Sequence, residues 1–283
     1  MTTASGYLAS VNGVGSLMSW VINEQRPASQ YVLSNTAGGT GRGGGITDWT
    51  GTLSGKGGKP PGGLFPNMIF QFQGYTAPTS GVEGGDGPIY SGEAIVRQIT
   101  VNWNFRTNEI IEWTAEIASR SSLTNAEGAP FLDNTPVASD FTCGQFFSQG
   151  GVEIPAINNA TLTISANLFE TANSSTRDAN GCFILRGPGP LDWNLTAQNE
   201  DHVRGGPYPE PGDRDLEMDL RINDTESWLL DFAYFEGYGN FTANRDGTVI
   251  SRQMTWNMNA QSSTGVLGRI VCPGETVPAW PTP

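Results

Sequence analysis

The chain has little of what enzymes commonly use for catalysis. It contains one histidine, His202, and three cysteines without Cys-x-x-Cys spacing. Catalysis by Ser-His-Asp or Cys-His-Asn needs a histidine base, and zinc sites need several His or Cys ligands at matched spacing. His202 lies in a Pro/Gly-rich segment and is interpreted as a loop residue. We therefore expect no catalytic residue, no metal site and no cofactor.

Long apolar runs are also missing. No stretch approaches the ~18 apolar residues that favour a membrane span, and the first residues lack the charged-then-apolar pattern of a secretory signal. The three cysteines (Cys143, Cys182 and Cys272) are odd in number, which favours unlinked thiols in a reducing compartment. These features predict synthesis in the cytoplasm and no membrane partner.

Positive charge is scarce. Fifteen Lys and Arg stand against 28 Asp and Glu, for a formal net charge of −13. Such a surface repels nucleic acid and anionic membranes. The Gly-rich stretches Gly38–Gly45 and Gly51–Gly57 lack the Lys-Ser/Thr ending of a phosphate-binding loop, so they are interpreted as plain loops.

Glycine and proline are plentiful, with 37 and 18 residues in 283, while charged residues make up only 15%. This composition favours short strands and many turns over helices. We predict an all-β fold with at most short helices, Ser139–Ser148 being a weak candidate. The chain length allows two ordinary domains.

A first internal repeat appears at an offset of 144 residues. Leu17–Asn23 aligns with Thr161–Asn167 without a gap up to an Asp-Trp pair. The matched positions, taken as structural residues of the repeat, include Arg42, Asp48 and Trp49 in the first copy and Arg186, Asp192 and Trp193 in the second.

Two further blocks follow in the same order. Arg97–Asn104 aligns with Arg252–Asn259 at an offset of 155, and Phe72–Tyr75 resembles Phe235–Tyr238. Three ordered blocks indicate duplication. We predict two tandem homologous β-sandwich or barrel domains: residues 1–120, a linker over 121–140, and residues 141–283 with a long insertion near 199–215 and an extended C-terminal tail.

The clearest local pattern is a β-hairpin around Arg106–Asn108. Apolar residues alternate with polar ones from Ala94 to Phe105 and from Glu109 to Ala118, which is the period of a half-buried strand. Pairing around the loop places Val101 opposite Trp113, so one face is apolar. Arg252–Asn259 repeats the pattern, and its return strand is predicted over Val266–Cys272.

Three other features leave alternatives open. Leu53–Phe65 and Asn199–Asp215 are interpreted as long loops, which are functional or ordered by a partner in many proteins. Acidic residues occupy alternate positions from Asp213 to Asp219. They are interpreted as a solvated face, as a deliberately anionic surface, or as a calcium or glycosidase site. Trp49 and Trp193 pack in the core or stack on sugars.

Together, these features resemble the major tail tube proteins of long-tailed bacteriophages. The resemblance rests on Asp48-Trp49-Thr50-Gly51 after a Gly-rich loop, on Gly92–Trp103, and on their second-copy equivalents. It implies β-sandwiches whose strands join those of neighbours into an inner barrel, with stacked rings. In one branch each chain carries two tube domains and three chains form a pseudo-sixfold ring, and the duplication is similar to that branch.

The resemblance also implies a location for each polar group. A channel that passes DNA should hold no phosphate, so acidic and amide side chains suit its lining. One strand face is the candidate lumen lining, with the outer surface as the alternative: Gln98, Thr100, Asn102, Asn104, Glu112, Glu116, Gln253, Thr255, Asn257 and Asn259. Candidate ring-to-ring contacts are Lys56, Lys59, Asp201, Arg204 and Asp213.

The expected role is therefore a structural subunit of the virion tail. Its partners would be other copies of itself, other tail proteins and passing DNA. A capsid decoration or carbohydrate-binding β-sandwich is the alternative, and a glycoside hydrolase is a third. Carbohydrate-binding modules usually display aromatic residues on loops, whereas most tryptophans here fall at alternating strand positions.

Overall fold

The computed structural model describes most of the chain. The described residues are 2–11, 14–25, 29–32, 40–43, 45–61, 64–77, 81, 85–130, 142–144, 147–179, 181–200, 208–223, 226–242, 251–259, 264 and 268–273. Among them, strands dominate and no α-helix occurs. The predicted all-β class is confirmed.

Among the described residues, the first half of the chain contributes nine strands. They are β1 (Thr2–Val11), β2 (Val14–Gln25), β3 (Ser29–Val32), β4 (Thr40–Gly43), β5 (Asp48–Lys56), β6 (Ile69–Tyr75), β7 (Gly87–Asn104), β8 (Glu109–Ser119) and β9 (Thr124–Gly128). Six of them pair in the closed order β1-β2-β5-β8-β7-β6-β1, which makes an antiparallel barrel. Closure leaves these strands with no open edge inside the barrel.

The second half contributes the remaining strands. They are β10 (Phe147–Gln149), β11 (Val152–Glu153), β12 (Ile157–Ala166), β13 (Phe169–Thr171), β14 (Arg177–Asp178), β15 (Gly181–Cys182), β16 (Leu185–Gly187), β17 (Leu191–Glu200), β18 (Leu216–Arg221), β19 (Ser227–Thr242), β20 (Ser251–Met258) and β21 (Ile270–Val271). Their main pairing order is β12-β17-β20-β19-β18-β10.

The two halves share this pairing order. Strands β12, β17, β20, β19 and β18 pair in the sequence in which β2, β5, β8, β7 and β6 pair, and β21 lies beside β19 as β9 lies beside β7. Irregular pairing also recurs: the register shifts at Val96/Gln98 in β7 and at Phe235/Gly237 in β19, an offset of 235 − 96 = 139.

Strand order corrects two of the sequence alignments. Phe72–Tyr75 lies in β6, whereas Phe235–Tyr238, with which it was aligned, lies in β19, the counterpart of β7. Strand β20, which was aligned with β7, occupies the place of β8, and its hairpin partner is β19. The return strand predicted over Val266–Cys272 is wrong, since β21 pairs β19. The cause is physical, because every strand of a two-faced sheet carries the same alternation of large apolar and small polar residues. The sequence of β20 can therefore align with β7 as well as with β8.

Several segments predicted to be loops contain regular structure. Strand β4 lies inside Gly38–Gly45, and β5 covers Gly51–Gly57 up to Lys56, so neither Gly-rich stretch is a plain loop. Strand β5 continues to Lys56, and Leu53 and Leu64 are buried, so Leu53–Phe65 is not an exposed loop throughout. Strand β9 lies inside the segment expected to be an irregular linker. The hairpin β7–β8 is confirmed, including Val101 opposite Trp113. The division into two domains stays a prediction.

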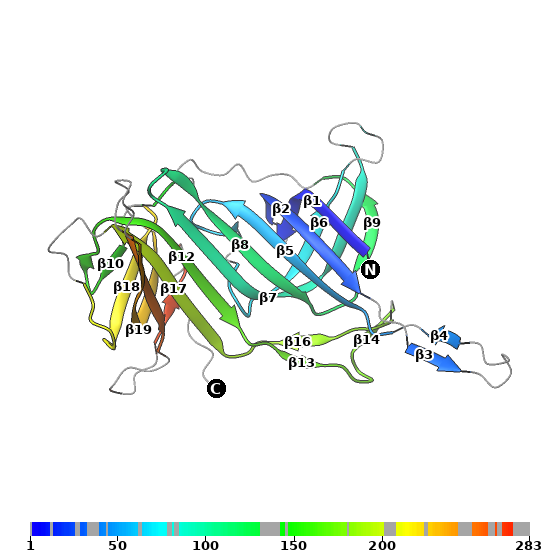
Figure 1. Ribbon diagram of the computed structural model, residues 1–283. Helices are drawn as coiled ribbons and strands as arrows, with labels where there is room; N and C mark the ends of the chain where they lie inside the picture. The colour runs from blue at the N-terminus through cyan, green and yellow to red at the C-terminus, as the bar shows by residue number, and fades with distance from the viewer. Residues whose placement is uncertain are drawn as a thin grey trace.

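The halves join through β7 and β12. Over Gln98–Asn104, β7 pairs β8 on one edge and β12 on the other. A continuous eight-stranded sheet results, in the order β2-β5-β8-β7-β12-β17-β20-β19. Figure 1 shows β5, β8, β7, β12 and β17 side by side in this sheet. We call it the long sheet.

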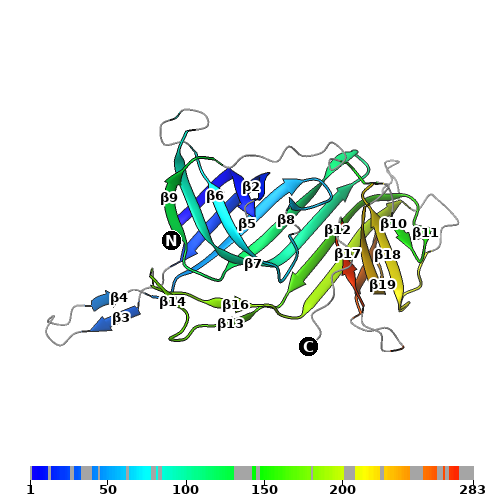
Figure 2. The ribbon, with the colours of Figure 1, turned by 180° about the vertical axis from the view of Figure 1, so that it is seen from behind.

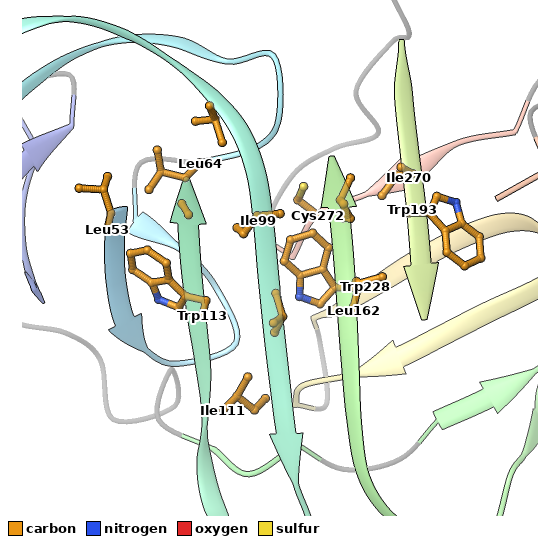
Figure 3. Close-up of a cluster of buried hydrophobic side chains, with 14 of the residues drawn as sticks. Leu53, Leu64, Ile99, Ile111, Trp113, Leu162, Trp193, Trp228, Ile270 and Cys272 are labelled. Carbon is orange, nitrogen blue, oxygen red and sulfur yellow. The ribbon is translucent and has the colours of Figure 1, made fainter. Parts of the chain in front are cut away.

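One apolar row crosses the long sheet and links the two halves. Each member is the register partner of the next, in the order Trp113, Val101, Leu162, Leu195, Trp256 and Phe235. All six are buried. Figure 3 shows Leu53, Trp113, Leu162 and Trp228, which come from both halves, in one cluster. A single core therefore spans the join.

Several tryptophans lie directly over glycines of other strands. A Cβ built on Gly55 would lie 2.7 Å from Cζ2 of Trp113, and one on Gly92 would lie 2.7 Å from Cζ2 of Trp49. A Cβ on Gly74 would meet the Trp20 ring at the same distance. Real side chains avoid such short contacts, so these strand positions admit only glycine while the indoles stay in place.

The shared core predicts a single unfolding transition. Leu162→Ala, at the centre of the row, should lower the free energy of unfolding by about 3 kcal/mol because it leaves a cavity between the halves. Urea unfolding followed by tryptophan fluorescence and by circular dichroism should give one coincident, shifted transition. Thr163→Ala, on the opposite face, is the control and should change little. Two separate transitions would contradict the shared core.

Candidate functional site

The long sheet has one apolar and one polar face, because successive side chains of a strand point to opposite sides. The apolar face packs in the core, and the polar face carries mostly hydroxyl and amide groups. One complete row of register partners reads Ser19, Ser54, Thr114, Thr100, Thr163, Asn194, Asn257 and Tyr234. None of these side chains is buried. We call this surface the polar face.

Hydrogen bonds link neighbouring strands across the polar face. Thr161 Oγ1 donates to Asn102 Oδ1 at 2.9 Å, which crosses the join between the halves. Asn159 Nδ2 donates to Gln198 Oε1 at 3.0 Å, from β12 to β17. These bonds occupy amide groups within the sheet and hold the side chains close to the surface.

Further contacts extend the pattern to β20 and β19. Asn194 Nδ2 donates to Asn257 Oδ1 at 2.6 Å, and Asn257 Nδ2 donates to Glu236 Oε2 at 2.9 Å. The Asn257 amide thus uses both its donor and its acceptor on the same face. The exposed surface of these strands is therefore polar and carries little charge.

The charges that do lie on the polar face are mainly negative. Glu112, Glu116, Asp192 and Glu236 are exposed. Lys56 is paired with Glu112 at 3.2 Å, and both side chains are more than half exposed, so water screens this pair strongly. The acidic groups outnumber Lys56 and Arg214, which lies over the Tyr234 ring, and the face therefore offers little attraction to a polyanion.

A cross-half ion pair holds the edge of the long sheet. Arg186 in β16 donates to both carboxylate oxygens of Asp48 in β5, at 2.7 and 3.1 Å, and to Oγ of Ser119 in β8 at 2.8 Å. It also donates from Nε to Glu170 at 2.8 Å. The Arg186 side chain is only 6% exposed. A buried guanidinium in this geometry fixes its partners in orientation as well as in distance.

Asp48 reflects this environment in its pKa. Burial alone would raise the pKa of Asp48, but the hydrogen bonds and charge of Arg186, with hydrogen bonds from Ser119 and the Trp49 N–H, hold it below its ordinary value. The carboxylate therefore stays ionised in the folded chain to a lower pH than an ordinary aspartate does.

The structure places the expected lumen-facing residues on the polar face. Gln98, Thr100, Asn102, Asn104, Glu112 and Glu116 lie on β7 and β8, and Gln253, Thr255 and Asn257 lie on β20. Asn259 follows β20, and its N–H donates to the Phe232 carbonyl. The register joins the two groups through β12 and β17.

Sequence reasoning missed the middle of this surface. Thr161, Thr163 and Ser165 of β12 and Asn194, Thr196 and Gln198 of β17 complete it. The alternation Thr-Leu-Thr-Ile-Ser over 161–165 was a usable signal, since it has the same period as the hairpin.

The expected ring-to-ring residues fall in different places. Lys56 ends β5, inside the long sheet and not in a loop. Lys59 pairs with Glu226 at 3.1 Å, and Asp213 accepts a hydrogen bond from the Glu210 N–H. Asp201 and Arg204 lie outside the described residues. Their contact with a neighbouring chain stays a prediction.

The repeat residues split by role. Trp49 and Trp193 are buried, which confirms core packing over sugar stacking. Asp48 and Arg186 pair with each other across the halves, whereas Asp192 is exposed. Arg42 lies in β4, opposite Gln30 of β3.

The acidic stretch around β18 shows no ion site. Asp219 accepts a hydrogen bond from Arg221 at 3.4 Å, and within the described part of the chain no three His, Cys, Asp or Glu residues gather as metal ligands. His202 lies outside that part. Among the described residues, no helix is long and apolar enough to span a membrane.

Comparisons with known proteins add no relative. No protein-family model matches the chain, and no curated protein matches it either.

The Asp48–Arg186 pair predicts an acid-dependent loss of stability. Asp48→Asn should lower the free energy of unfolding at pH 7 by about 2 kcal/mol, less than the ~3–5 kcal/mol for a fully buried pair because Glu170 remains. Since the folded pKa of Asp48 is depressed, its contribution is present above the unfolded value near 3.8 and is lost as the pH falls through the folded pKa.

Urea unfolding at pH 7 and at pH 3 measures both effects. Asp192→Asn is the matched control, because Asp192 holds the same position in the repeat and is exposed. It should shift stability by less than about 0.5 kcal/mol. Equal losses for the two variants at pH 7 would contradict the assigned role of Arg186.

Proposed function

We propose that this chain is a structural subunit of a phage tail tube, in which the polar face lines the channel for DNA. The observation that carries the proposal is the join between β7 and β12: it fuses two curved units into one wall without a break in the polar face. Repeating this wall around an axis, from one chain to the next, would close a ring. The subunit would work in the virion tail after synthesis in the host cytoplasm.

The recurring strand order supports a specific pairing of strands between neighbouring chains of the ring. Strand β19 holds the place of β7, and beyond Phe235 no other strand pairs its second edge within the described part of the chain. Strand β2 holds the place of β12. We infer that the far part of β19 pairs with β2 of a neighbouring chain, as β7 pairs with β12 inside one chain. Three chains would then close a pseudo-sixfold ring.

The position of β2 in the isolated chain defines a step in this assembly. Strand β12 pairs β7 through Asn159–Ser165, which corresponds to residues 15–21 of β2 after subtraction of 144. These residues pair β1 in the free chain. Strand β1 therefore protects an edge that would otherwise attract other strands, and it has to leave β2 before the ring closes.

The chemistry of the polar face suits passage of DNA. Binding of DNA by proteins depends largely on phosphate contacts from Lys and Arg, which release counterions. A surface of hydroxyls, mutually bonded amides and a few carboxylates, whose lysine Lys56 is paired with Glu112, provides few such anchors. DNA would therefore move along it without being held.

The carbohydrate-binding alternative loses its main support. Trp20, Trp49, Trp103, Trp113, Trp193, Trp228 and Trp256 are all buried. Sugar stacking requires exposed rings, and none of the tryptophans in the described part of the chain provides one.

Assembly tests the proposal directly. Purified protein should form trimers or hollow tubes in negative-stain microscopy, with tubes increasing at higher concentration. A chain that stays monomeric at all concentrations would remove the proposed function.

A reversible tether tests the role of β1. Thr3 and Asn23 are register partners, and Thr3 Oγ1 donates to Asn23 Oδ1 at 3.0 Å, so Thr3→Cys/Asn23→Cys should form a disulfide. The oxidised variant should stay monomeric and the reduced variant should assemble. Asn159→Cys/Gln198→Cys, which tethers β12 to β17, should assemble in both states. Assembly of the oxidised Thr3/Asn23 variant at the wild-type rate would rule out the release of β1.

Charge reversal tests which face lines the channel. Glu112→Lys/Glu116→Lys should still form tubes but should retain duplex DNA in a salt-dependent way, because the new lysines contact phosphates. The control is Glu153→Lys/Glu217→Lys, at exposed positions on β11 and β18. Tubes of both variants are mixed with DNA, with and without a blocker that binds the tube ends. The DNA that sediments with the tubes is then measured. Equal retention by the two variants would place Glu112 and Glu116 outside the channel.

A further inference from the structure

Each half of the chain sends out a β-ribbon between two strands of the long sheet. In the first half, β3 and β4 lie between β2 and β5 in sequence. In the second half, β13 and β16 lie between β12 and β17. The two ribbons occupy the same place in the shared strand order, but their surroundings differ.

The β13–β16 ribbon is docked on the first half. Besides the Arg186–Asp48 pair, the Arg186 carbonyl accepts a hydrogen bond from Arg120 Nε at 2.6 Å. Asn67 and Gly189 exchange two hydrogen bonds, at 2.8 and 3.0 Å. The ribbon follows the lower edge of the long sheet toward the first half in Figure 1. It therefore ties the second half to the unit whose β7 pairs β12.

The β3–β4 ribbon is arranged differently in the single chain. Figure 1 and Figure 2 show it projecting away from the body of the molecule. In the part of the chain that the structure describes, β3 and β4 pair only with each other. A short two-stranded ribbon is only marginally stable in water on its own, so a docking surface would complete it.

The projecting ribbon and the docked ribbon share an Arg-Gly pair at equivalent positions, Arg42-Gly43 and Arg186-Gly187. Arg42 precedes Asp48 by six residues, as Arg186 precedes Asp192. The receptor for Arg186 is Asp48, at the start of β5. Its equivalent in the second half is Asp192, at the start of β17 and at an offset of 192 − 48 = 144. Asp192 is exposed, and no ion pair joins it to another described residue.

We propose that the β3–β4 ribbon docks on the second half of a neighbouring copy of this chain, with Arg42 paired to that neighbour's Asp192. This inference rests on the proposed function and names a contact that the ring would use. The geometry is consistent, because the neighbour that supplies β19 to β2 is also the one that presents Asp192. Strand pairing and ribbon docking thus involve the same two chains, as they involve the same two halves within one chain.

Charge exchange tests the contact. Arg42→Asp and Asp192→Arg should each raise the critical concentration for tube formation by about tenfold or more, since each places like charges together. The double variant Arg42→Asp/Asp192→Arg should return it to within about threefold of wild type. Critical concentrations are measured by sedimentation of tubes, and unchanged melting temperatures confirm that each variant folds.

The outcomes separate the contact from the wider proposal. If wild-type protein forms tubes and the single variants do so at the same concentration, the docking contact is overturned while the tube function stands. If the single variants fail and the double variant fails equally, the two residues do not pair, and the contact is again overturned. If wild-type protein never assembles, both proposals fall.

Discussion

Hydrogen bonding on both edges of β7 governs the architecture. An unpaired strand edge leaves backbone N–H and C=O groups open to other chains, so a stable sheet must close, cover or extend its edges. The first half closes its barrel through β1 and still extends through Gln98–Asn104, because β7 is long enough to leave the barrel. The core, the polar face and the ribbon contacts all follow from that extension. A shorter β7 would leave the barrel of the first half separate from the sheet of the second half.

This arrangement gives the two faces of the long sheet different tasks. The apolar face is committed to a core that crosses from Trp113 to Trp256, so it sets stability and the relative position of the halves. The polar face makes few demands on packing, since its amides bond to one another, as Asn194 does to Asn257. Its chemistry is therefore free to meet the needs of whatever passes over it.

The sequence predicted the all-β class, the β7–β8 hairpin and the polar alternation, because these depend on local periodicity. It did not predict that β20 takes the place of β8, since Met254 and Trp256 alternate with polar residues just as Ile99 and Val101 do. The Arg186–Asp48 pair was also out of reach: the repeat aligned Arg186 with Arg42, but only the fold brings it to a carboxylate 138 residues away. Pairing between strands is a long-range property that one-dimensional patterns do not encode.

The glycines beneath the indoles have a consequence for how this chain can change over time. Gly55 and Trp113, or Gly92 and Trp49, fill one volume between them, so neither residue can vary independently. Enlarging the glycine requires a smaller ring opposite, and shrinking the ring leaves a hole that the glycine cannot fill. Related chains should therefore keep or lose such pairs together, and part of the high glycine content is a counterpart of the tryptophans and not a sign of loops.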